Sequence, residues 1–119
     1  MKPARRAATP AQVRRFALSL LEAVEAPHFD KTSFRIRGKI FATVPPGGEH
    51  LHVFVGEPER DVMAAAAPQA YEKLWWGKKP VGLRVTLAKA KAADVEELLR
   101  SAWRDKAPKS LGRQRLNMK

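Results

Sequence analysis

Residues 33–55, SFRIRGKIFATVPPGGEHLHVFV, constrain the fold more than any other part of the chain. Polar and apolar residues alternate there in three short runs, and glycine-containing segments separate the runs. Because successive side chains of a β-strand point to opposite faces, each run predicts a strand with one apolar face. Arg37-Gly38 suits a two-residue hairpin turn, and Pro45-Pro46 lacks the N–H donors that a ladder requires. We therefore predict an antiparallel meander with strands at residues 33–37, 39–44 and 50–55.

Amphipathic helices are predicted on both sides of this meander. Thr9 and Gln12 have the spacing of a capping box with Pro10 at the first helical position, and Pro27 follows the apolar stripe. A second helix is predicted between Pro58 and Pro68, and a third before Pro108. The predicted apolar faces are Val13, Phe16, Ala17, Leu20, Leu21 and Val24; then Val62, Met63 and Ala66; then Val95, Leu98, Leu99, Ala102 and Trp103, with Glu96 and Arg100 as an exposed ion pair.

Two further segments complete the expected sheet. Residues 71–77 predict a loop or a short strand rich in aromatic residues, and residues 81–87 alternate like a half-buried strand. Adjacent side chains of a regular strand face opposite ways, so we expect one of Trp75 and Trp76 in the core and the other in a surface groove. The elements predict an α+β two-layer sandwich with helices on one face of an antiparallel sheet. Its predicted core contains Phe16, Leu20, Leu21, Val53, Val85, Leu98 and Trp103.

Charge divides the chain into three parts. Residues 1–20 contain five basic residues and no acid, residues 106–119 also contain five and no acid, and the formal net charge is +11. The part between them is nearly balanced. At 119 residues the chain has the length of one domain. We expect a flexible basic arm at 1–8, one domain at 9–108 and a basic tail at 109–119.

A basic surface of this kind attracts polyanions such as nucleic acid. We predict phosphate contacts from the hairpin at residues 35–39, from the first helix and from the segment at residues 76–79, where a tryptophan is also available for stacking on bases. The alternative is that exposed arginines and basic tails only keep the domain in solution. The candidate DNA-binding residues are Arg14, Arg15, Arg35, Arg37, Lys39, Trp76, Lys78 and Lys79.

The sequence contains no pattern that predicts catalysis. It has no cysteine, its serines have no nucleophile-elbow or lysine-dyad context, and no glycine-rich phosphate loop precedes a helix. His50 and His52 share a strand face, but a third metal ligand is not evident. We expect no enzyme activity, no metal and no cofactor. No apolar run reaches the length of a membrane span, and we expect a cytoplasmic location.

The ordered series SFRIRGKIFATV, PPGG with HLHVFV, YEKLWWG, VGLRVTL and AWRDKAPKSL resembles the MmcQ/YjbR family of small bacterial proteins. The resemblance covers residues 13–111. It implies a CyaY-like, that is frataxin-like, two-layer α+β fold and a DNA-binding role through a double-wing arrangement of hairpins. The hairpin at residues 33–39 occupies the position of the family's characteristic hairpin, and the resemblance supplies no catalytic residue.

Two alternatives remain open at this point. One is a protein-interaction module, in which Tyr71, Trp75 and Trp76 anchor a partner peptide in an aromatic groove. The other is frataxin-like iron binding, which resembles an acidic ridge on the first helix. That helix carries Arg14 and Arg15 here, which argues against iron. Weak, largely sequence-independent binding of duplex DNA is the favoured prediction.

Overall fold

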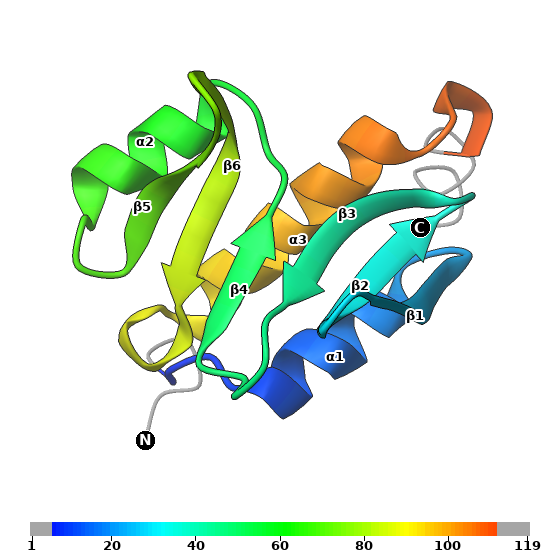
Figure 1. The fold of residues 1–119 in the computed structure, drawn as a ribbon, viewed down its shortest axis with the longest axis horizontal. Coiled ribbons are helices and arrows are strands. Elements are labelled where there is room, and N and C mark those ends of the chain that lie inside the picture. The colour runs from blue at the N-terminus through cyan, green and yellow to red at the C-terminus, as the bar shows by residue number, and fades with distance from the viewer. Residues whose placement is uncertain (1–5, 112–119) are drawn as a thin grey trace.

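The computed structural model of the protein describes residues 6–111. Four strands follow the first helix, and two more strands follow the second, as Figure 1 shows. In sequence the elements are α1 (Pro10–Ser19), β1 (Ala23–His28), β2 (Lys31–Ile36), β3 (Lys39–Val44), β4 (His50–Val53), α2 (Glu59–Ala66), β5 (Tyr71–Trp76), β6 (Lys79–Thr86), a 3-10 turn η2 (Leu87–Lys89) and α3 (Ala92–Lys106).

The strands form one six-stranded antiparallel sheet in the order β1-β2-β3-β4-β6-β5. Strands β1 to β4 are a meander, and α2 then carries the chain to the edge, where β5 begins and β6 returns to pair with β4. The helices cover one face of the sheet and leave the other open (Figure 1). The predicted α+β two-layer architecture is confirmed, with four strands in the meander instead of three.

The first helix is shorter than predicted. The capping box of Thr9 and Gln12 is present, but α1 ends at Ser19, and Glu22 then adopts a positive φ of 60°. The next residues form β1, where Val24 pairs with Arg35 and is 53% exposed, so it does not belong to the helical stripe. Pairing with β2 determines the conformation of this segment, because tertiary contacts override a weak helical propensity.

Two bulges interrupt the sheet. Phe34 pairs with Ala42 while Arg35 pairs with Ile40, so Phe41 is an extra residue in β3. Phe41 and Ala42 are both buried as a result. In β6, Val81 is the extra residue, because Leu74 pairs with Gly82 and Trp75 pairs with Pro80. A bulge changes which face the following side chains occupy and increases the local twist.

The core lies between the sheet and the helices. Of the predicted core residues, Leu20, Val53, Val85, Leu98 and Trp103 are buried. Phe16 and Leu21 are only partly buried. The Arg100 guanidinium lies over the Phe16 ring at 5.2 Å from its centroid, which explains why this ring tolerates partial exposure. The indole Nε1 of Trp103 donates a hydrogen bond to the Leu21 carbonyl at 3.0 Å.

Three details of the helices differ from the prediction. Val62 is 58% exposed, and Ala66 is also exposed, so of the predicted face only Met63 packs against the core, together with Ala64. Glu96 accepts a hydrogen bond from Gln12 Nε2 and therefore does not pair with Arg100. The actual partner of Arg100 is Glu97, at 2.6 Å.

Within the described residues, no helix is long and apolar enough to cross a membrane.

The packed region extends beyond both predicted boundaries. Ala8 is buried and its N–H donates to the Ala90 carbonyl, while the Ala92 N–H donates to the Arg6 carbonyl. At the other end Leu111 is buried in the core cluster. The remainder of the predicted arm and tail, residues 1–5 and 112–119, lies outside the described residues.

Candidate nucleic-acid interface

The open face of the sheet contains a hollow of about 460 Å³. It extends from the β1–β2 hairpin to the β5–β6 hairpin, and the end of α3 also reaches it. Aromatic and imidazole rings line much of it, and no carboxylate does. The lining residues are His28, Lys31, Ile40, Thr43, His52, Phe54, Leu74, Trp75, Trp76, Val81 and Lys106.

Strands β3, β4, β5 and β6 all contribute side chains to the hollow. Strands β3 and β4 share the pairs Ala42 with Val53 and Thr43 with His52, and the Phe54 N–H donates to the Phe41 carbonyl at 3.1 Å just after β4. After Val53 the chain passes directly over Gly82, where a Cβ atom would lie 2.2 Å from the Val53 carbonyl oxygen and 2.9 Å from Phe54 Cα. Glycine at position 82 therefore permits a close crossing of two backbones, and Phe54 reaches the open face just beyond it.

Basic and neutral groups determine the electrostatics of the hollow. Burial lowers the pKa of His52, and the charges of Arg84, Lys31 and His50 lower it further, so His52 is neutral at pH 7. Lys31 contacts Asp30 at the edge of the hollow, with 3.5 Å between Nζ and Oδ1. Lys106 makes no ion pair within the described part of the chain. The hollow therefore provides positive charge beside aromatic rings.

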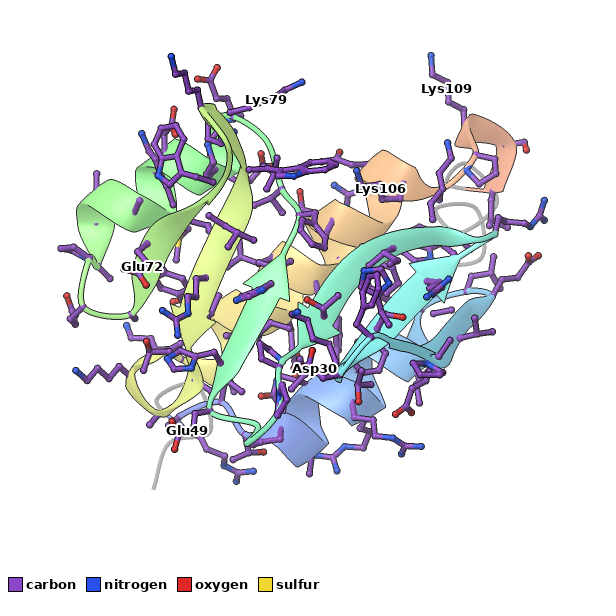
Figure 2. The ribbon with its side chains drawn as sticks, in the orientation of Figure 1. Asp30, Glu49, Glu72, Lys79, Lys106 and Lys109 are labelled. Carbon is purple, nitrogen blue, oxygen red and sulfur yellow. The ribbon has the colours of Figure 1, made fainter. Side chains whose placement is uncertain are left out.

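Lysines gather at one end of the molecule. The antiparallel order places the β2–β3 and β5–β6 turns at the same end of the sheet. Figure 2 shows Lys79, Lys106 and Lys109 along that end. We call Lys39, Lys78, Lys79, Lys106 and Lys109 the lysine rim. Within residues 6–111, none of the five forms an ion pair.

The arginines of the predicted hairpin patch are held by the protein itself. Arg37 occupies the β2–β3 turn with a φ of 52°, and its Nε and Nη2 donate to the two Glu22 carboxylate oxygens at 2.6 and 3.1 Å. This contact lowers the pKa of Glu22 and raises that of Arg37. Arg35 donates to Ser33 Oγ at 2.9 Å and to the Pro27 carbonyl at 3.1 Å. Of this predicted set, Lys39 alone is exposed and outside any ion pair in the described residues.

The cations of α1 lie apart from this end. Helix α1 belongs to the layer that covers the other face of the sheet, so Arg14 and Arg15 do not border the hollow. Arg14 pairs with Glu25 at 2.8 Å. Arg15 lies beside Arg6 and Glu96 in a separate depression of about 410 Å³. Of the predicted site residues, Trp76 alone lines the hollow, and Lys78 and Lys79 follow it in the β5–β6 hairpin.

The expectation for the paired tryptophans is wrong. Trp75 is 55% exposed and Trp76 is 82% exposed, and both line the hollow. They lie at the end of the edge strand β5, and the register shifts between Leu74 and Trp75. The extra residue of this bulge, Val81, is in β6, so the bulge does not interrupt β5 itself. The two rings are the last residues of the edge strand, next to the turn, and neither is required to fill the interior.

The prediction that Tyr71 anchors a peptide in a surface groove is also wrong, because its side chain is buried. Burial and the nearby Asp94 charge raise the pKa of its hydroxyl to about 12. It therefore cannot contact a bound peptide.

His50 and His52 do lie on the open face of β4, but the described residues contain no group of three or more His, Cys, Asp or Glu side chains that could hold a metal ion.

Sequence reasoning did not assign five contributors to this region. His28, Phe29 and Lys31 belong to the β1–β2 hairpin, whose first strand was predicted as helix and whose turn contains no glycine. Lys106 was counted as part of the basic tail, but the end of α3 brings it to the hollow. Phe54 had a detectable pattern, since it alternates with Leu51 and Val53 and shares a face with His50 and His52.

Phe29 has an unusual backbone conformation for a bulky residue. Its φ is 58°, its side chain is 90% exposed, and Gly77 has a similar φ of 64° at the equivalent first position of the β5–β6 turn. Positive φ costs an L-residue roughly 1–2 kcal/mol, and glycine avoids this cost. Phe29→Gly should therefore leave the free energy of unfolding unchanged or raise it by up to about 1 kcal/mol, as measured by urea denaturation.

The control for this substitution is Val24→Gly in the same hairpin. Val24 is exposed too, but it pairs with Arg35 in extended backbone and has no positive φ. Glycine in a strand should lower stability by roughly 0.5–1 kcal/mol. Equal losses for the two variants would show that the Phe29 backbone is not strained.

Comparison with known proteins gives a family and a fold. The YjbR family model matches residues 18–105. A crystal structure of Deinococcus radiodurans protein DR2400, with a DUF419 domain, superposes with a TM-score of 0.70 at 20% identity, covering 86% of this chain and 78% of that one. A search of curated proteins gives no match. Because the family model covers the whole sheet and all three α-helices in whole or part, the chain belongs to the YjbR family.

Proposed function

We propose that this protein binds DNA without catalysis, weakly and with little sequence preference. The observation that carries the proposal is the lysine rim at one end of the sheet, with Lys106 in the lining of a hollow that contains no carboxylate. Phosphate neutralisation by lysine releases counterions, and this term supplies nearly all the free energy of non-specific binding. Membership of the YjbR family is compatible with this function, although family and fold do not by themselves define it.

Near the β5–β6 end, carboxylates form ion pairs with basic residues that do not belong to the lysine rim. Arg60 contacts Glu57 at 3.4 Å and Asp61 at 3.1 Å, and Lys73 contacts Asp61 at 3.5 Å. At the β2–β3 turn, Glu22 is matched by Arg37. These contacts leave the charge of the lysine rim available for a polyanion, although the carboxylate of Asp105 is close enough to feel the charge of Lys106.

The proposal predicts a salt-dependent affinity for duplex DNA. If about four phosphates are engaged, log K should fall with log salt with a slope near −3.6, and the dissociation constant should be about 10⁻⁴ to 10⁻⁶ M at physiological salt. Fluorescence anisotropy of a labelled duplex, titrated at several salt concentrations, measures both quantities. A wild-type protein that shows no salt-dependent binding even at low salt would contradict the proposal.

A charge-matched pair of variants locates the interface. The first variant combines Lys78→Gln, Lys79→Gln and Lys106→Gln. In it the slope of log K against log salt should become less negative by about two to three, and DNA binding should weaken about tenfold to a hundredfold. The control combines Arg15→Gln, Lys89→Gln and Lys91→Gln, which removes the same charge from exposed residues outside the hollow. Equal losses in both variants would mean that net charge matters and the rim does not.

A peptide-binding groove is the second candidate, and the exposure of Trp75 and Trp76 favours it. Because Tyr71 is buried, it cannot anchor a peptide, and the groove would depend on the two tryptophans and Phe54. Binding to an apolar peptide would change little with salt, because it neutralises no phosphates. The salt titration therefore distinguishes the two functions.

A further inference from the structure

Large aromatic side chains are exposed on two sides of the hollow. Trp75 and Trp76 lie on the β5 side, and Phe29 lies at the tip of the β1–β2 hairpin. The Phe29 and His28 rings contact each other edge-on, with 4.8 Å between their centroids. His28 itself lines the hollow. Burying such rings in the core would contribute to stability, so their exposure favours a role in contacting a ligand.

The backbone keeps these rings at the surface. The pairing of β5 with β6 shifts between Leu74 and Trp75, because Val81 is an extra residue in β6, and Phe29 holds a positive φ that glycine would adopt more readily. Strained conformations persist where the surroundings impose them, and they concentrate at functional sites. The β1–β2 and β5–β6 hairpins therefore each expose aromatic rings, the first beside a positive φ and the second beside a change of pairing register.

The chemistry of the hollow specifies a flat ligand that carries negative charge. Aromatic rings offer stacking surfaces, Lys31 and Lys106 supply positive charge, and the lining contains no carboxylate. Its volume of about 460 Å³ lies within the roughly 300–1,000 Å³ of small-molecule sites. A nucleotide combines a flat base with an anionic phosphate and so matches both features.

We propose that the hollow binds the unpaired bases of single-stranded nucleic acid, with Trp76 as the principal stacking surface. The bases of a duplex are paired and stacked on one another, so they cannot present their faces to the rings. The lysine rim contacts phosphates of either form, whereas the aromatic rings add affinity for the single strand alone. This inference rests on the proposed function and names its preferred ligand.

The test compares an oligothymidine of about ten nucleotides with the same strand annealed to its complement, within the site sizes of single-strand binders. The single strand should bind about tenfold more tightly than the duplex and should quench tryptophan fluorescence. Trp76→Ala should weaken single-strand binding about fivefold to a hundredfold, since one base stack is lost, and should leave duplex binding unchanged. Val62→Ala, at another exposed apolar side chain, is the control and should change neither affinity.

The outcomes separate this inference from the proposed function. Equal affinity for both forms, or single-strand binding that Trp76→Ala leaves unaltered, would overturn the inference while salt-dependent duplex binding still supports the proposed function. Absence of salt-dependent binding to either DNA would overturn both. Loss of single-strand affinity in Trp76→Ala with retained duplex binding would support both.

Discussion

Replacing Trp103 with alanine is expected to lower the free energy of unfolding by about 3–5 kcal/mol. Trp103 lies on α3, its side chain is 2% exposed, and it packs within the core cluster. Truncation would remove a large apolar side chain and leave a cavity, because the surrounding helices and sheet relax only partly. It would also leave the Leu21 carbonyl without its indole donor. Urea denaturation followed by far-UV circular dichroism measures the change.

The matched control is the same substitution at Trp76. That ring is 82% exposed, so Trp76→Ala should change stability by no more than about 0.5 kcal/mol. Should Trp103→Ala fail to fold, Trp103→Phe remains measurable. It retains most of the apolar volume but removes the N–H, and it should cost about 1–3 kcal/mol, since the partly buried Leu21 carbonyl loses its partner. Equal stabilities for wild type and both Trp103 variants would contradict the assignment of Trp103 to the core.

Replacing Gly82 with alanine should cost about 1–3 kcal/mol or more. The added Cβ atom would meet backbone atoms of Val53 and Phe54 at distances that no real Cβ contact shows, and backbone cannot rotate away as a flexible side chain can. The end of β4 must therefore move away from β6. Because Phe54 follows directly and lines the hollow, the substitution should also weaken single-strand binding, whereas Trp76→Ala affects binding without affecting stability.

Gly56→Ala is the control for this prediction. A Cβ at Gly56 would have no neighbour within 4 Å, and its φ is not positive. Alanine there should change stability by no more than about 0.5 kcal/mol. Equal losses at the two glycines would show that the crossing over Gly82 is not closely packed. Denaturant midpoints measured in parallel for both variants decide the question.

Local patterns predicted the elements whose structure depends on near neighbours. The capping box fixed the start of α1 at Pro10, and the run from Lys39 to Val44 formed a strand with the predicted bounds. The apolar stripe of α3 is buried throughout, because a helix of this length turns one continuous face to the sheet. These features follow from side-chain periodicity and from hydrogen bonds between residues close in sequence.

The candidate site was only partly predictable. Composition indicated a basic protein, and Lys78, Lys79 and Trp76 were identified as possible ligand contacts. The sequence could not show that Arg37 is paired with Glu22, because that contact joins a hairpin turn to the residue just before β1. It also could not bring Lys106 from the end of α3 to the open face. Both depend on the packing of segments that are distant in sequence.

The sequence by itself determined the elements with strong periodicity, the α+β class and the basic character of the chain. Only the tertiary structure decided that residues 23–28 form a strand, that both tryptophans are exposed and that Phe54 enters the hollow. The physical reason is that strand pairing, bulges and backbone crossings derive their free energy from partners elsewhere in the chain. Such partners outweigh the weak local preference of a short segment.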